Sequence, residues 1–163
     1  MEFDFNALSR LLKKNVDDRE MLQLIGNRRI DREGSRGDLE FKEHGVALVF
    51  SEFDATIPPS EVDNPKGLYL SGIHFHRLNH EGYQGYIGSF PWDIGFGDSE
   101  PQIVERAGKA AKEGGGGGRS PILKRPIPRW LRYDFSGNAL LLRFDLDGKL
   151  ELVTLFVPQI RRT

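Results

Sequence analysis

Residues 68–74 read Leu68-Tyr69-Leu70-Ser71-Gly72-Ile73-His74, and residues 150–156 read Leu150-Glu151-Leu152-Val153-Thr154-Leu155-Phe156. Both stretches are short, largely apolar and rich in β-forming residues, which is typical of buried strands. At the same offset of 82 positions, the pattern from Asp17 to Gly26 matches the pattern from Ser99 to Gly108. Each of these two stretches has a capping residue, apolar positions at helical spacing and a terminating glycine. Two matches in one register predict a tandem repeat, and a fold that presents a surface rather than houses a reaction.

The repeat predicts an α+β fold of two helix-plus-three-stranded antiparallel units in tandem, with an extra N-terminal helix. Residues 1–80 would hold the N-terminal helix and the first unit, and residues 81–163 an aromatic connection and the second unit. The two units are expected to form one continuous or closely abutted sheet, and they could also form one continuous domain. Helices are expected at 6–14, 17–26 and 99–108, and strands at 38–43, 46–52, 68–76, 130–135, 139–145 and 150–157.

The segments between these elements are also informative. Residues 27–37 are charged and lack periodicity, which favours a loop, and prolines between Pro58 and Pro65 predict a stiff connection. Residues 78–97 combine glycines with large aromatic rings, a mixture that flexible linkers lack, so we expect this connection to pack as an ordered segment. Hairpin turns are predicted at His44-Gly45, Ser136-Gly137-Asn138 and Asp147-Gly148.

The composition excludes several classes of protein. A net charge of −1 argues against non-specific nucleic-acid binding, which requires a basic surface. The chain of 163 residues has no cysteine, so disulfides, thiolate nucleophiles and cysteine zinc sites are excluded. It has no apolar run long enough to span a bilayer, and its start lacks the features of a secretory signal. We therefore expect a cytoplasmic protein without membrane or nucleic-acid partners.

The second half of the chain resembles a known family. The resemblance rests on Gly95-Phe96-Gly97-Asp98-Ser99 opening a helix, a glycine-rich gap, Trp130-Leu131-Arg132-Tyr133-Asp134 and the leucine-rich strands that follow. These features resemble small bacterial proteins with the tandem helix-plus-sheet fold of the beta-lactamase-inhibitor-protein type. Many of them are immunity proteins of polymorphic or type VI toxin systems, so the resemblance implies binding and neutralisation of a cognate toxin protein. The absence of a lipobox cysteine argues against the lipoprotein members.

Two alternatives to an immunity protein remain open. One is a non-catalytic binding or scaffold module of a secretion or envelope assembly, and the other, more remote, is a metal-dependent hydrolase that uses the histidines. Because no serine lies in a nucleophile-elbow pattern and Ser99 is explained as an N-cap, we expect no catalytic residue and no enzyme activity. Tyr133 is predicted to be core. The hypothetical contact set for a toxin is Lys42, His44, His74, Tyr86, Trp92, Arg132 and Arg143.

Neither a cofactor nor a metal is predicted. The glycine run at 114–118 is followed by Arg119-Ser120, but it lacks the first glycine, the lysine and the following helix of a phosphate-binding loop. His74 and His76 would face the same way on a strand, which is compatible with a shared metal. His80 falls in a turn and His44 lies elsewhere, so no third ligand is evident from the spacing.

Overall fold

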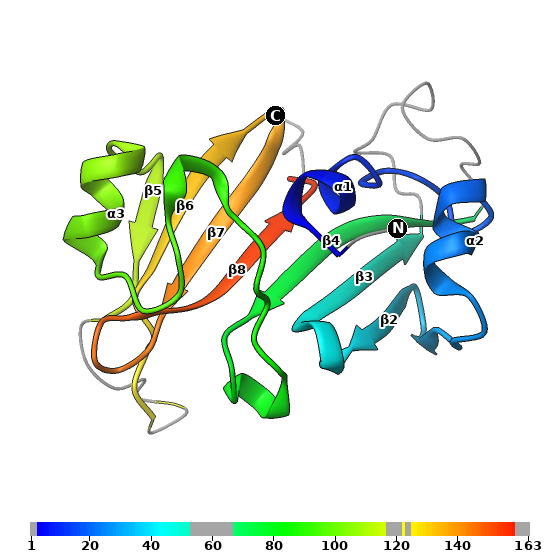
Figure 1. Ribbon diagram of the computed structural model, residues 1–163, viewed down its shortest axis with the longest axis horizontal. Coiled ribbons are helices and arrows are strands. Elements are labelled where there is room, and N and C mark those ends of the chain that lie inside the picture. The colour runs from blue at the N-terminus through cyan, green and yellow to red at the C-terminus, as the bar shows by residue number, and fades with distance from the viewer. Residues whose placement is uncertain (1–2, 53–66, 117–121, 123–124, 159–163) are drawn as a thin grey trace.

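The structure of the protein, a computed structural model, describes residues 3–52, 67–116, 122 and 125–158. Within these residues the strands form one eight-stranded sheet in the order β1-β2-β3-β4-β8-β7-β6-β5 (Figure 1). All neighbouring strands are antiparallel. The strands are β1 (Asp31–Glu33), β2 (Arg36–Phe41), β3 (Val46–Glu52), β4 (Leu68–His76), β5 (Lys112–Gly114), β6 (Trp130–Phe135), β7 (Asn138–Phe144) and β8 (Leu150–Phe156).

The predicted fold class is wrong, because the strands do not form two three-stranded units. β4 pairs directly with β8, with Ile73 opposite Leu155 and His74 opposite Thr154, and this pairing joins both halves into a single sheet. The short strands β1 and β5 extend the sheet at its two edges. The physical reason is that β4 and β8 are long and largely apolar. At the edge of a sheet, each would expose a row of unpaired backbone groups beside apolar side chains, and pairing the two strands with each other avoids this.

Six of the strands lie where the sequence predicts them. β3, β4 and β6 have the predicted bounds, β2 and β7 are shifted toward the N-terminus by two residues and one residue, and β8 ends one residue early. The turns at Ser136-Gly137 and Asp147-Gly148 are confirmed as hairpin connections between paired strands. At Gly45 a single turn of 3-10 helix, η1 (Lys42–His44), precedes the glycine. The proline-rich connection and residues 117–121 of the glycine segment lie outside the described residues.

The helices are shorter than predicted. They are α1 (Phe5–Ser9), α2 (Arg19–Ile25) and α3 (Glu100–Ala107). The expected helix at 6–14 ends early because its last residues pair with β4. The Lys13 N–H donates to the Leu70 carbonyl (2.8 Å), and the Leu70 N–H donates to the Lys14 carbonyl (2.9 Å). The N-cap of α2 is Asp18, not the predicted Asp17, and its carboxylate accepts from the backbone of Glu20.

The predicted N-cap of α3 is confirmed. The Gln102 N–H donates to Ser99 Oγ (3.4 Å), and the Ser99 N–H donates to Gln102 Oε1 (2.9 Å), which together form a capping box. Gly108 ends the helix with φ at 84°, in the region that favours glycine.

This capping box leads to a first prediction. We expect Ser99→Ala to lower the free energy of unfolding by about 1 kcal/mol, because one N-terminal N–H of α3 loses its acceptor. Urea denaturation followed by circular dichroism measures the change. Ser89→Ala, at an exposed position in the connection, is the control. Equal stabilities of the two variants would contradict a stabilising role for the box.

One face of the sheet carries the hydrophobic core. Figure 1 shows α1 and the connection between β4 and α3 crossing this face, with α2 and α3 near its two ends. Phe5 of α1 packs on Phe75 of β4 (ring centroids 5.4 Å apart), and Phe90 of the connection packs on the same ring (5.6 Å). The ordered connection is thus confirmed. Leu131, Tyr133 and Phe135 of β6 point into this layer, so Tyr133 is core as expected.

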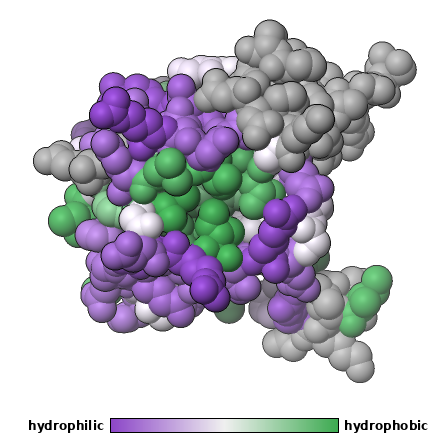
Figure 2. Space-filling view, turned by 90° about the vertical axis from the view of Figure 1, so that its right-hand side faces the viewer, coloured by the Kyte–Doolittle hydropathy of each residue, from purple (hydrophilic) through white to green (hydrophobic). Residues whose placement is uncertain are grey.

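One side of the molecule carries an apolar area at its surface. Figure 2 faces the side on which α2 lies and shows apolar side chains gathered at its centre, with polar side chains around them. Leu22 of α2 is 54% exposed, and Val16 and Ile30 are partly buried against the core. In the part of the chain that the structure describes, no helix has the length and apolar character needed to cross a bilayer.

Candidate functional site

The second face of the sheet carries no α-helix among the described residues, and it is called here the open face. The strand alternation places Arg36, Ser51, His74, Thr154 and Arg132 on it, from β2 across to β6. These side chains line a hollow of about 680 Å³ that spans the middle of the sheet. A hollow of this size suits a small ligand or a few side chains of a partner.

The floor of the hollow is built from hydroxyl groups and one imidazole. Ser51 Oγ and Ser71 Oγ lie 2.7 Å apart, and His74 Nδ1 and Thr154 Oγ1 lie 2.8 Å apart. Ser71 is the extra residue of a bulge between β3 and β4, where Val49 pairs with Gly72 and Phe50 pairs with Leu70. Bulges often re-aim a side chain near functional sites, and here the bulge allows Ser71 to line the hollow beside Gly72.

The rim of the hollow is positively charged. Arg36, Lys112 and Arg132 line it, and no described lining residue is a carboxylate. Arg36 pairs with Asp38 (3.1 Å), whereas the Arg132 guanidinium lies over the Phe156 ring (5.3 Å). Burial lowers the pKa of His74, and the nearby charge of Arg36 lowers it further. The hollow therefore favours anionic groups, because its cations lie close to a floor of hydrogen-bonding groups.

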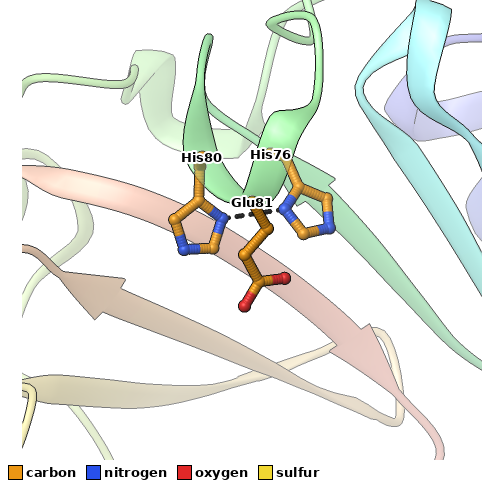
Figure 3. A group of neighbouring side chains, drawn as sticks. All are labelled: His76, His80 and Glu81. Carbon is orange, nitrogen blue, oxygen red and sulfur yellow. Dashed lines mark hydrogen bonds between the residues drawn. The ribbon is translucent and has the colours of Figure 1, made fainter.

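A cluster of titratable side chains lies at the end of β4, next to the hollow (Figure 3). His76 belongs to β4 and is buried, whereas His80 and Glu81 belong to the 3-10 turn η3 (His80–Gly82). The two Nδ1 atoms of His76 and His80 lie 2.8 Å apart, and one ligand atom from each of the three residues lies within 4.8 Å of the others. Tyr83 stacks on the His76 ring (3.8 Å between centroids).

Arg143 and Glu151 surround His80. Arg143 Nη2 donates to His80 Nε2 (3.0 Å), and Glu151 Oε2 lies 3.7 Å from the same nitrogen. A guanidinium can only donate, so His80 Nε2 is the acceptor and His80 Nδ1 carries the proton. His76 Nδ1 therefore accepts the hydrogen bond from His80. A bulge opposite Arg143 makes Glu151 an extra residue of β8, which allows its carboxylate to share this face.

The structure separates the sequence-predicted contact set into three groups. His74, Arg132 and Arg143 lie on the open face. Tyr86 is buried under the connection, where its hydroxyl accepts from the Phe5 N–H (2.7 Å). Trp92 packs against Tyr133 (5.2 Å between centroids) in the core layer. Lys42 and His44 are exposed on η1, at the end of the β2–β3 hairpin, where the His44 ring stacks on Phe3.

Several residues of the site were not found by sequence reasoning. Arg36 and Lys112 fall in segments that were expected to be loops, and Glu81 and Glu151 were not considered as neighbours of the histidines. The pair His74 and His76 faces the same way, as expected, but His76 contacts His80 instead (ring centroids 5.0 Å apart). The spacing His76-x-x-x-His80-Glu81 at the end of a predicted strand could have indicated this cluster, because a turn after the strand can bring His80 and Glu81 back to His76.

Comparison with known proteins adds a fold neighbour only. No protein-family model matches the chain. Among solved structures, the chain is similar to the crystal structure of a DUF4309 family protein (YjgB) from Bacillus subtilis subsp. subtilis str. 168. The identity is 10%, the TM-score is 0.45, and the match covers 85% of this chain and 76% of the other. The function must therefore be argued from the geometry of the site.

Proposed function

We propose that the protein is a non-catalytic binding protein whose open face receives an acidic segment of a partner protein. The observation that carries this proposal is the hollow of about 680 Å³ with Arg36, Lys112 and Arg132 around it and no carboxylate among its described lining residues. Charge complementarity of this kind steers association and rejects partners of the wrong charge.

The class of partner follows from the sequence resemblance to immunity-type proteins. We propose a cognate bacterial toxin, neutralised when the open face covers its active site. A toxin that hydrolyses cell-wall polymers carries catalytic carboxylates in a cleft, and an inhibitor needs complementary shape and charge there rather than chemistry of its own. Ser51, Ser71 and Thr154 would supply hydrogen bonds at the centre of such an interface.

A charge-reversal experiment tests the proposal. We expect Lys112→Glu with Arg132→Glu to weaken binding to the toxin at least tenfold, because two cations of the rim would be replaced by carboxylates that repel an acidic segment. The toxin candidate is the product of the reading frame adjacent to this gene, and isothermal titration calorimetry with growth protection in co-expressing cells gives the readout. Neither substitution should prevent folding, since Lys112 is exposed and Arg132 lies at the surface over Phe156.

The matched control is Arg10→Glu with Lys109→Glu, which reverses the same number of charges at exposed positions away from the hollow. It should bind and protect as the parent does. If both double variants lose binding equally, net charge rather than the hollow governs association. If the adjacent gene product neither binds nor harms cells, the toxin partner is excluded and a scaffold role with another acidic protein takes its place.

A further inference from the structure

Three potential metal ligands meet at one end of β4. His76 Nδ1, His80 Nδ1 and the Glu81 carboxylate come from six consecutive positions of the chain, and Figure 3 shows the two imidazoles facing each other with the Glu81 side chain between them. Their ligand atoms lie within 4.8 Å of one another. The buried His76 ring is held by the stacked Tyr83 ring, and Glu81 is exposed. The His76 side of the cluster is thus held in place, and the Glu81 side is open to solvent.

We propose that His76, His80 and Glu81 bind a divalent cation of the zinc class. Two imidazole nitrogens and one carboxylate oxygen form a ligand set that zinc accepts readily, with the fourth position taken by water or by a group of a partner. Magnesium and calcium prefer all-oxygen sites, so the two imidazoles select against them. This site is separate from the cationic hollow and does not depend on the proposed toxin.

The backbone holds the turn in the shape that the site needs. Glu81 has φ at 53°, in the left-handed region that favours glycine, and Asn79 before the turn has φ at 69°. The Tyr83 N–H donates to the His80 carbonyl (3.0 Å), and the Asn79 N–H donates to the Tyr83 carbonyl (2.8 Å). A non-glycine residue in this conformation is strained, and such strain often marks a functional position. Here the strain brings Glu81 beside the two histidines.

The geometry requires only a small adjustment on binding. Two nitrogens on one tetrahedral zinc, each at about 2.0–2.1 Å, are roughly 3.3 Å apart. The Nδ1 atoms of His76 and His80 are 2.8 Å apart in their hydrogen bond, so a modest ring rotation opens the space. His76 Nδ1 accepts the hydrogen bond from His80 and carries no proton of its own, so its lone pair can bind a metal once the His80 proton is displaced.

Glu151 provides the outer support that a metal-bound histidine needs. In the hydrogen-bonded pair, His80 carries its proton on Nδ1 because Arg143 donates to Nε2. When His80 Nδ1 binds the metal, the ring carries its proton on Nε2. Arg143 Nη2 must then leave Nε2, and Glu151 Oε2, 3.7 Å away, is placed to accept the hydrogen bond from the Nε2–H. Metal-bound histidines commonly donate their second ring N–H to such a carboxylate. Glu151 also offsets the charge of Arg143, whose Nε lies 3.6 Å from Glu151 Oε1.

The test is a titration of the full chain, without a histidine tag, with ZnCl2 and with CoCl2. We expect one zinc ion per chain by calorimetry and, with cobalt, the visible absorption of a tetrahedral site. His80→Gln should abolish binding, Glu81→Gln should weaken it at least tenfold, and Glu151→Gln should weaken it about 10–100-fold. Glu33→Gln, an exposed glutamate on β1, is the matched control and should bind as the parent does.

Nitrogen NMR of the histidine rings gives a second readout that does not depend on the variants. His80 should carry its proton on Nδ1 in chelator and on Nε2 with zinc, while Zn²⁺ replaces the Nδ1 proton. If His80→Gln does not fold, the exposed Glu81→Gln variant and this tautomer change decide. The proposal is overturned by absence of saturable one-to-one zinc binding, by equal zinc affinity in Glu81→Gln and the parent, or by His80 keeping its Nδ1 proton with zinc bound.

Discussion

Gly45→Ala is expected to lower the free energy of unfolding by about 3 kcal/mol or more. Gly45 has φ at 69°, where any other residue is strained. A Cβ there would overlap the Tyr86 backbone nitrogen and would lie 2.5 Å from the Gln84 carbonyl oxygen and 2.8 Å from the Gly85 carbonyl carbon. These are backbone atoms, which cannot move away by a side-chain rotation, so the segment from Gln84 to Tyr86 itself must shift.

Gly45 is sensitive because three segments meet there. Its carbonyl accepts from the His76 N–H (2.8 Å), the Tyr86 N–H donates to the His76 carbonyl (2.9 Å), and the Gln84 N–H donates to the Lys42 carbonyl (2.9 Å). The β2–β3 hairpin, the end of β4 and the connection are thereby held together. Displacing the connection should also loosen the packing of Tyr86 against Phe75.

Gly148→Ala is the matched control. Gly148 has φ at 76°, but no atom lies within 4 Å of the position that its Cβ would occupy. Gly148→Ala should lower the free energy of unfolding by only about 1–2 kcal/mol, which is the cost of a positive φ for a residue with a Cβ. Urea denaturation of both variants measures the difference, and hydrogen exchange at the Gln84 and Tyr86 amides should rise only in Gly45→Ala. Equal destabilisation of the two variants would show that the close approach at Gly45 is not a constraint.

The strands were predictable where their side chains alternate or are largely apolar. Leu140, Leu142 and Phe144 of β7 show the alternation directly, and each of them is buried against the core. β1 and β5 could not be found in this way, because Asp31-Arg32-Glu33 and Lys112-Glu113-Gly114 carry no apolar pattern. They are held at the sheet edges by backbone pairing with a neighbouring strand and by ion pairs such as Arg32–Glu52 and Arg129–Glu113, none of which needs an apolar pattern.

The arrangement of the strands was not predictable from the repeat. A shared offset identifies similar elements, but it does not say whether two similar strands, here β4 and β8, lie in separate sheets or pair with each other. The length of the N-terminal helix was misjudged for a related reason. Its apolar spacing continues to Leu12, yet the backbone of Lys13 and Lys14 is hydrogen-bonded to Leu70 of β4.

The site was predictable only in part, because it combines residues that are far apart in the sequence. His74, Arg132 and Arg143 follow from strand alternation, which places them on one face. Glu151 reaches Arg143 and His80 only because a bulge interrupts the alternation of β8, and Glu81 reaches the histidines through a positive φ. Tyr86 is buried and Trp92 partly buried because the connection packs on the opposite face, and aromatic content alone does not decide between burial and exposure.

His76 should make the protein sensitive to acid. Its pKa is about 3 in the folded protein and 6.5 in the unfolded chain, chiefly because burial disfavours the charged ring, and the His80 and His74 imidazoles and Arg143 face it. Between these pH values the unfolded chain binds a proton that the folded protein does not. The contribution of His76 to the free energy of unfolding is therefore fully present above about pH 6.5, and it is lost as the pH decreases toward about 3.

For this single group the loss between pH 7 and about pH 4 is on the order of 3 kcal/mol. We expect urea denaturation in the presence of EDTA to show that His76→Gln loses less stability over this range than the parent, by up to this amount. His44→Gln is the matched control, because that imidazole is exposed and folding does not require its removal from water. The comparison is made within each variant, so any stability that the substitution itself costs cancels. If the parent and His76→Gln lose the same free energy between the two pH values, the buried imidazole takes up its proton without unfolding, and the cluster around it is open enough to hydrate the charge.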